Sequence, residues 1–159
     1  MKRKVYLETT LVSYLTARPS ADVIRAARQK MTKRWWDMRR KDFELHVSQL
    51  VVDEAAGGDP EAARERLAKL AGVPRLTVSE EAVQLSEELL IQHALPTKAV
   101  DDAIHIAVAS VHGMDFLLTW NCTHIANAEL MDGIRTTISS CGYKCPVICT
   151  PEEMLGGLG

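Results

Sequence analysis

The sequence lacks any run of about eighteen apolar residues, so no segment is expected to cross a membrane as a helix. Its first residues are basic, but Glu8 interrupts the apolar stretch that a signal peptide requires. It also has no internal repeat, low-complexity tract or domain linker. We therefore expect a single cytoplasmic domain over residues 1–159 with no membrane partner.

An excess of charge of one sign is also missing, because 19 basic residues stand against 21 acidic ones and the net charge is -2. A nucleic-acid partner would therefore need a local basic patch, since the surface as a whole does not attract phosphate. Hydrophobic residues make up 47% and charged residues 25% of the chain, values typical of globular proteins. Disordered, coiled-coil and collagen-like classes are thereby disfavoured.

The sequence contains no Cys-x-x-Cys pair, the spacing most typical of zinc sites. Its cysteines all lie in the last quarter of the chain, and they are Cys122, Cys141, Cys145 and Cys149. Three of them recur every fourth residue, but Pro146 would break any single helix that aligned them. We therefore expect reduced, partly buried thiols.

Segments typical of strands alternate with segments of helical periodicity along the whole chain. The expected strands are residues 5–7, 43–47, 76–78, 116–118 and 146–149. The expected helices are a short one capped by Thr9 or Thr10, then 20–40, 48–57, 60–72, 79–93, 98–111, 127–141 and a short one from Pro151. Such alternation predicts an α/β fold, a three-layer α/β/α sandwich around a parallel sheet.

Acidic residues follow the expected strands, where ligands collect in parallel sheets. Glu8 comes directly after the first strand, Asp53 and Glu54 lie beyond the second, and Asp101 and Asp102 open a later helix. Adjacent helical residues point about 100° apart, so at most one of each pair is expected to be central. Singly, each residue could equally stabilise a helix N-terminus or remain solvated.

Four segments combine these residues in one order along nearly the whole chain. They are Glu8-Thr9-Thr10, Ser48 to Glu54, Asp102-Ala103-Ile104 and Leu117-Leu118-Thr119-Trp120-Asn121. This pattern resembles the PIN-domain family, and within it the VapC-like group, the toxins of bacterial toxin-antitoxin pairs. The resemblance implies a PIN-like fold, metal-dependent ribonuclease activity with Mg²⁺ or Mn²⁺, an RNA substrate and an antitoxin partner.

The resemblance also implies catalytic roles for individual residues. The first three acidic positions of the family fall on Glu8, Glu54 and Asp102, which are the implied metal ligands. The fourth falls on Asn121, which could offer its carbonyl oxygen as an auxiliary ligand. The family usually has the shorter Asp at the first position and a charged side chain at the fourth.

Auxiliary roles fall on neighbouring polar residues. Thr9 and Thr119 match hydroxyl positions that accompany the first and fourth acidic positions of the family. Asp101 could partly replace the missing fourth charge, and His124 could position a phosphate or a metal-bound water. His105 is three residues beyond Asp102 and close enough for a polar contact on a helix. A structural role is the commoner alternative for either histidine.

Residues 30–41 are rich in basic side chains and contain Trp35 and Trp36. They could follow an RNA backbone and stack on bases. They could also form an amphipathic helix with one tryptophan buried and the charges solvated. A contact in a homodimer or with an antitoxin is a third use of the same residues.

Carboxylate oxygens suit a hard divalent cation, which can activate water and stabilise charge on a phosphodiester. The leading hypothesis is thus an endoribonuclease that uses one or two metal ions. Because Glu8 and Asn121 depart from the family pattern, the alternative is a catalytically silent PIN-like module that binds RNA or a protein. A hydrolase of a small phosphorylated substrate would use the same carboxylate chemistry.

Overall fold

The computed structural model describes residues 1–156, and the last three residues of the predicted domain lie outside this part. A five-stranded parallel sheet forms the centre, with the strand order β3-β2-β1-β4-β5. The strands are β1 (Arg3–Leu7), β2 (Phe43–Ser48), β3 (Arg75–Leu76), β4 (Phe116–Leu118) and β5 (Val147–Cys149).

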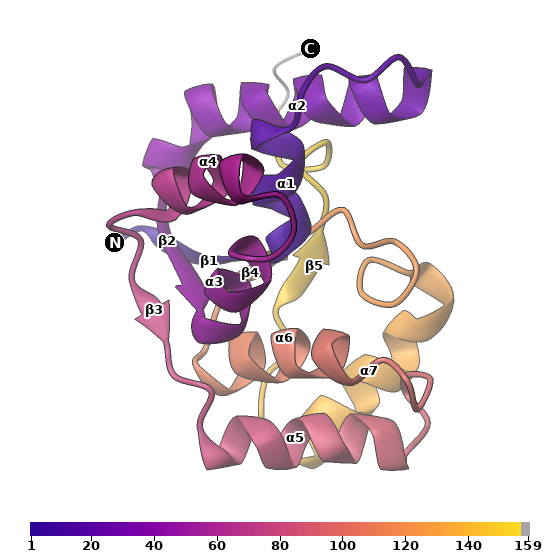
Figure 1. Cartoon of the computed structure of the whole chain (residues 1–159). Coiled ribbons are helices and arrows are strands. Elements are labelled where there is room, and N and C mark those ends of the chain that lie inside the picture. The colour runs from indigo at the N-terminus through magenta and orange to yellow at the C-terminus, as the bar shows by residue number, and fades with distance from the viewer. Residues whose placement is uncertain (157–159) are drawn as a thin grey trace.

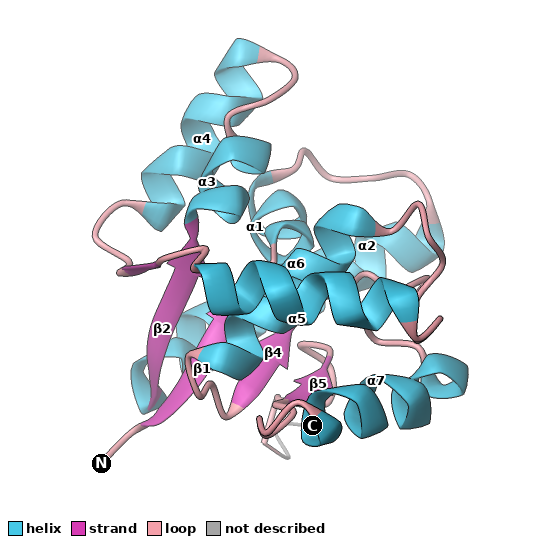
Figure 2. Cartoon of the chain, turned by 90° about the horizontal axis from the view of Figure 1, so that it is seen from below, coloured by secondary structure: helices cyan, strands magenta, loops and turns pink. Residues whose placement is uncertain are grey.

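Helices cover both faces of the sheet, which confirms the predicted α/β/α sandwich. They are α1 (Thr9–Thr16), α2 (Val23–Arg39), α3 (Gln49–Ala55), α4 (Pro60–Leu70), α5 (Glu80–Ile91), α6 (Val100–Val111) and α7 (Ala128–Ser140), with a 3-10 turn η1 (Arg40–Asp42) before β2. Figure 1 shows α1 and α2 above the sheet and α5, α6 and α7 below it. Seen from below, α3 and α4 project together beyond the end of β2 (Figure 2). No helix in residues 1–156 is long and apolar enough to cross a membrane.

The strand order reverses at β1, and this reversal positions the candidate site. After β1 the chain runs outward to β2 and β3, and then returns to pair β4 with the other side of β1. Leu7 and Leu118 are register partners at the ends of β1 and β4, and the Glu8 N–H donates to the Leu118 carbonyl over 3.1 Å. Such a reversal opens a crevice at the carboxyl ends of the strands. Residues that follow β1 and β4 therefore meet there.

The core is built around β1, whose Val5, Tyr6 and Leu7 are all fully buried. Burial of each large apolar side chain contributes about 1.5–3 kcal/mol before entropy is counted. The alternation of buried apolar and exposed polar residues expected for β2 is incomplete, because the adjacent residues His46 and Val47 are both buried. A parallel strand inside a sheet covered on both faces has no solvated face, so period-two patterning describes it poorly.

Side-chain caps define several helix starts, as expected at Ser48 and Ser79, which accept the N–H groups of Val51 and Ala82. The expected cap of α1 by Thr9 or Thr10 is wrong. Glu8 occupies the N-cap position, and its side chain caps no backbone N–H.

The short helix expected from Pro151 is also absent among the described residues. The chain there forms turns, closed by a bond from the Met154 N–H to the Pro151 carbonyl. That three-residue step is shorter than the four-residue step that propagates an α-helix.

Both tryptophans of α2 are buried, whereas the amphipathic-helix interpretation placed only one inside. Trp35 stacks on Phe43 with ring centroids 6.1 Å apart, and Arg40 lies over Trp36 at 5.1 Å. The buried face of α2 is wide enough to include both adjacent positions. Neither indole ring is therefore free to stack on a base.

Candidate metal-binding active site

Glu8 lies at the junction of β1 and α1, and its side chain is buried, with 4% of the residue exposed. The hydroxyls of Thr10 and Thr119 both donate to its Oε1, over 2.5 and 2.6 Å. Its Oε2 accepts no hydrogen bond, and no cationic side chain pairs with it, within residues 1–156. A buried carboxylate held only by neutral hydroxyls has a negative charge that is incompletely balanced.

Glu54 stands near the end of α3, after β2, and it is likewise held through one oxygen. Its Oε1 accepts from the Thr9 hydroxyl over 2.5 Å and lies 2.7 Å from Nε2 of His105. Partial burial raises the pKa of the Glu54 carboxyl, but the hydrogen bond and electrostatic attraction of His105, together with the hydrogen bond from Thr9, outweigh burial and leave this pKa below its ordinary value. Among the described residues, Oε2 of Glu54 has no partner.

His105 joins the site from α6 and is fully buried. Its Nδ1 lies 2.7 Å from the Tyr6 hydroxyl, which in turn lies 2.8 Å from the Ser48 hydroxyl. Burial raises the pKa of Tyr6 well above its ordinary value, so its hydroxyl stays protonated. One chain of hydrogen bonds therefore runs from Ser48 through Tyr6 and His105 to Glu54.

Glu8, Glu54 and His105 form a compact cluster in which one ligand atom from each lies within 4.8 Å of the others. Two carboxylates at this spacing repel each other, and a cation between them would remove that repulsion. Their unbound Oε2 atoms are oxygen donors, which hard cations such as Mg²⁺ and Mn²⁺ prefer. The residues present therefore fit a divalent metal ion.

Asp102, in the first turn of α6, belongs to a second group beside this cluster. Its Oδ1 accepts from Nδ2 of Asn121 over 3.0 Å, and its Oδ2 lies 2.8 Å from Nδ1 of His124. The carbonyl oxygen of Asn121 accepts the His124 backbone N–H over 3.1 Å. Both oxygens of Asp102 and both ends of the Asn121 amide thus have protein partners. Asp101 is exposed and has no such partner in the described chain.

Thr119 connects the two groups. Its hydroxyl donates to Glu8 and accepts the backbone N–H of Asn121 over 2.9 Å, while Asn121 in turn binds Asp102. The carboxylates after β1 and at the start of α6 therefore belong to one hydrogen-bond network across the β1–β4 junction.

Most of the residues predicted from the sequence take part in two hydrogen-bond networks, although their partners differ from the expected ones. One network holds Glu8, Thr119, Asn121, Asp102 and His124, and the other holds Thr9, Glu54 and His105. His105 contacts Glu54 and Tyr6 rather than its helical neighbours Asp101 or Asp102.

The sequence analysis assigned no site role to Tyr6, Ser48 or Thr10, although Ser48 and Thr10 lie in two of the four quoted segments. Thr10 binds Glu8, while Tyr6 and Ser48 belong to the network of Glu54. Tyr6 looked like an ordinary core residue of a strand, and it lies 99 residues from His105 in the sequence. The available signal was the hydroxyl of Tyr6 near the end of a buried strand, because a buried hydroxyl needs a hydrogen-bond partner inside the protein.

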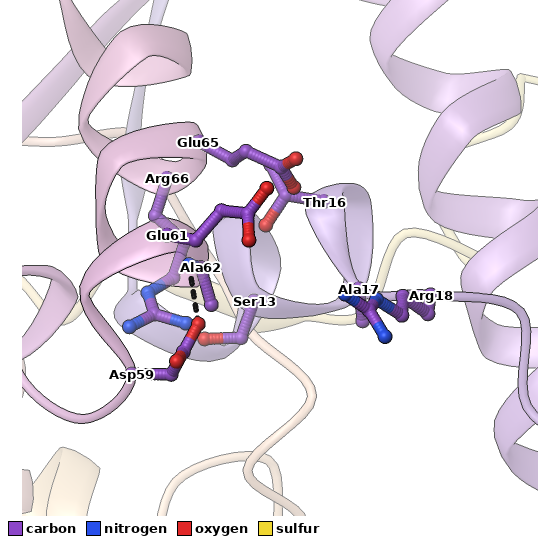
Figure 3. Close-up of a pocket in the computed structure, with 9 residues that line it drawn as sticks. All are labelled: Ser13, Thr16, Ala17, Arg18, Asp59, Glu61, Ala62, Glu65 and Arg66. Carbon is purple, nitrogen blue, oxygen red and sulfur yellow. Dashed lines mark hydrogen bonds between the residues drawn. The ribbon is translucent and has the colours of Figure 1, made fainter.

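A pocket of about 440 Å³ lies between the end of α1 and the first half of α4. Figure 3 shows Glu65 extending from α4 toward Thr16 of α1, and Asp59 beside Ser13. Ser13 is one helical turn from Thr9, which binds Glu54. The carboxylates of the cluster do not line this pocket, whose walls carry both acidic and basic side chains.

Comparison with known proteins finds no matching family model and no matching curated protein. Two solved structures share the fold. VapC20 of Mycobacterium tuberculosis, a sarcin-ricin loop cleaving toxin, superposes with a TM-score of 0.58 at 18% identity, over 87% of this chain and 95% of that one. VapBC2 of Rickettsia felis, bound to a DNA fragment from their promoter, gives 0.59 at 13% identity, over 92% and 98%.

The chain has the PIN-like fold of VapC proteins. The predicted fold is thereby confirmed. At these identities the likeness concerns the arrangement of helices and strands, and the chemistry must be argued from the residues of this chain.

Proposed function

We propose that this protein is a divalent-metal-dependent endoribonuclease of the PIN/VapC type, which hydrolyses phosphodiester bonds in RNA. The observation that carries the proposal is the pairing of Glu8 with Glu54 at the carboxyl edge of the sheet. Each has its Oε1 held by two donors and its Oε2 without a partner in the described chain. In each glutamate one oxygen is held by protein donors, and the other oxygen is left available to bind a cation.

In this proposal, Glu8, Glu54 and Asp102 hold Mg²⁺ or Mn²⁺. The bound ion would supply an activated water and stabilise the charge that develops on the phosphodiester. Asn121 and His124 orient Asp102 through the bonds described above, and Asn121 serves as an auxiliary ligand only if its carbonyl releases the His124 N–H.

The hydroxyls of Thr9, Thr10 and Thr119 keep the two glutamates in place, since each of them donates to an Oε1 atom. A hydroxyl donor fixes a carboxylate without adding a positive charge that would compete with a metal ion. These three residues therefore act by orienting the proposed ligands.

The proposal includes the biological setting of a cytoplasmic toxin with an antitoxin partner, and a homodimer as a further assembly. Its support is the fold shared with VapC20 and with VapBC2. The exposed basic side chains of α2 could contact an RNA backbone through charge alone, because the neighbouring indoles are buried.

A catalytically silent RNA- or protein-binding module is the second candidate. It is favoured by one observation, which is that both oxygens of Asp102 already have protein partners and that the neighbouring Asn121 is neutral. If those bonds persist, the third carboxylate does not reach a metal ion.

One assay separates these functions. Purified protein is incubated with labelled structured RNA, and separately with small phosphate esters, in Mn²⁺, Mg²⁺ or EDTA. We expect internal cleavage of RNA that requires metal and is abolished by EDTA. Glu8→Gln is the matched control, because it keeps the side-chain volume and removes the charge, so its cleavage should fall at least about 100-fold.

The other outcomes identify the alternatives. RNA binding without cleavage in any metal would establish the silent module, and turnover of phosphate esters alone would establish a small-molecule hydrolase. Cleavage that is equal in wild type and Glu8→Gln would show that the activity does not come from this site.

A further inference from the structure

His105 has no route to a substrate, because it is fully buried and both of its ring nitrogens face protein groups. We propose that His105 is a positioning residue, which donates its Nε2–H to Glu54 and so presents the other oxygen of Glu54 to the metal ion. Tyr6 and Ser48 set the tautomer that makes this possible. The inference rests on the proposed function and specifies how one ligand of that site is prepared.

The direction of the hydrogen bonds follows from what each group can donate. An ionised carboxylate only accepts, so the 2.7 Å contact between Glu54 Oε1 and His105 requires a hydrogen on Nε2. A neutral imidazole with that hydrogen has an acceptor at Nδ1, and the Tyr6 hydroxyl is placed to donate to it over 2.7 Å. The oxygen of Tyr6 can then accept from the Ser48 hydroxyl over 2.8 Å.

Ser48 is itself fixed by the fold. It is the N-cap of α3, where its Oγ accepts the N–H of Val51 and leaves its own hydrogen for Tyr6. The helix that Ser48 starts is the helix that carries Glu54. The chain of hydrogen bonds from Ser48 through Tyr6 and His105 to Glu54 therefore connects the first and last turns of α3 to β1 and α6.

The hydrogen bonds from Thr9 and His105 restrict the side chain of Glu54, although this side chain is partly exposed to solvent. About a third of its side chain is exposed, at 32%, and an unrestrained glutamate there would sample several rotamers. Two donors converge on Oε1, so a change of rotamer that carried Oε1 away from Thr9 and His105 would break both bonds. Outer partners of this kind typically contribute about 10- to 100-fold to metal affinity.

Direct ligation by His105 is the competing role for the same side chain. It would require a lone pair on Nε2, but that atom carries the hydrogen donated to Glu54 and Nδ1 is occupied by Tyr6. The geometry therefore favours positioning over ligation.

The test compares His105→Leu, which removes the donor, with His105→Gln, whose amide N–H can replace Nε2–H. Mn²⁺ affinity is measured by calorimetry and folding by thermal melting, with RNA cleavage as a third readout. We expect His105→Leu to weaken Mn²⁺ binding about 10- to 100-fold, and His105→Gln to recover most of it. Both variants should still show a cooperative melting transition.

Tyr6→Phe is a third variant, and it removes the hydroxyl that donates to Nδ1 and accepts from Ser48. It should weaken Mn²⁺ binding less than His105→Leu, because the imidazole remains but is no longer held in one tautomer. Nitrogen-15 spectra of the wild-type protein give a readout that needs neither metal nor a variant, and they should show a hydrogen on Nε2 of His105.

The outcomes are distinct. A folded His105→Leu variant with wild-type affinity would overturn the positioning role while leaving the proposed function intact. Equal losses in the Leu and Gln variants would also overturn it, because volume rather than the N–H would then matter, and so would a neutral His105 protonated at Nδ1. Wild-type protein that neither binds Mn²⁺ nor cleaves RNA would instead refute the proposed function itself.

Discussion

The Thr119 hydroxyl donates to Oε1 of Glu8 over 2.6 Å and at the same time accepts the N–H of Asn121 over 2.9 Å. Glu8 follows β1 and Thr119 follows β4, so one hydroxyl joins the two strand ends at the reversal of the strand order. Through Asn121 it also connects Glu8 to Asp102. We therefore expect substitutions of Thr119 to affect stability and, if the proposed metal site is correct, metal binding as well.

Thr119→Val should lower the free energy of unfolding by about 1–3 kcal/mol, because it keeps the shape but leaves the Asn121 N–H and Glu8 without this partner. Urea denaturation measures the change. Thr119→Ser keeps the hydroxyl and should lose much less. If the two variants are equally stable, the hydrogen bond of Thr119 is not an important contributor.

Asp102→Ala should remove most Mn²⁺ binding without unfolding the domain. Its partners Asn121 and His124 are only partly buried and can be hydrated once the carboxylate is gone. Asp101→Ala is the matched control on the same helix, and because Asp101 is exposed and lacks a protein partner in the described chain, it should bind Mn²⁺ as the wild type does. Calorimetric titration of the three folded proteins decides the matter. Unchanged affinity in Asp102→Ala would exclude Asp102 as a principal ligand.

Asn121→Asp should raise metal affinity and, at low metal concentration, RNA cleavage. The new carboxylate would lie close to Asp102, since Nδ2 of Asn121 is now 3.0 Å from Oδ1 of Asp102. Two like charges at that distance repel, so the metal-free variant should melt at a lower temperature and gain more from added Mn²⁺ than the wild type. Thermal melting and cleavage over a Mn²⁺ titration measure both effects. A normally folded variant with no gain in affinity would place residue 121 outside the metal shell.

The cysteines should differ sharply in reactivity. Burial, with a smaller effect of the neighbouring Glu153, raises the pKa of the Cys149 thiol to about 12, whereas Cys122 and Cys141 are exposed. At pH 8 almost no thiolate forms at Cys149 in the folded protein. Iodoacetamide should therefore modify Cys122 and Cys141 in native protein and Cys149 only after denaturation, as mass spectrometry can show. Rapid native labelling of Cys149 would contradict its burial.

The fold class was predictable from the sequence, and so was the presence of acidic residues at the carboxyl edge of the sheet, because both depend on short-range patterns. Apolar runs such as 116–118, separated by helical stretches with their caps, indicate parallel strands and crossover helices. Glu8 could be placed beside a ligand site because it directly follows a strand, and the carboxyl ends of parallel strands lie at one edge.

Local patterns failed where burial depends on what covers a residue. Trp36 has the same helical neighbours whether it faces water or protein, and only the packing of α2 buries it along with Trp35. His46 occupies a polar position of an alternating strand, yet a second helical layer covers that face. Amphipathic periodicity indicates which face of an element is buried. Whether a residue outside that face is also buried depends on tertiary contacts alone.

The residue pairs that form the site were decided by the tertiary structure. Glu54 meets His105 across 51 residues of sequence, His105 meets Tyr6 across 99, and Glu8 meets Thr119 across 111. No periodicity relates positions so far apart. They become neighbours because β1 lies between β2 and β4, so that α3 and α6, which follow and precede those strands, bring their side chains to the same end of β1. Which carboxylate oxygen is held and which is left free depends on that long-range packing.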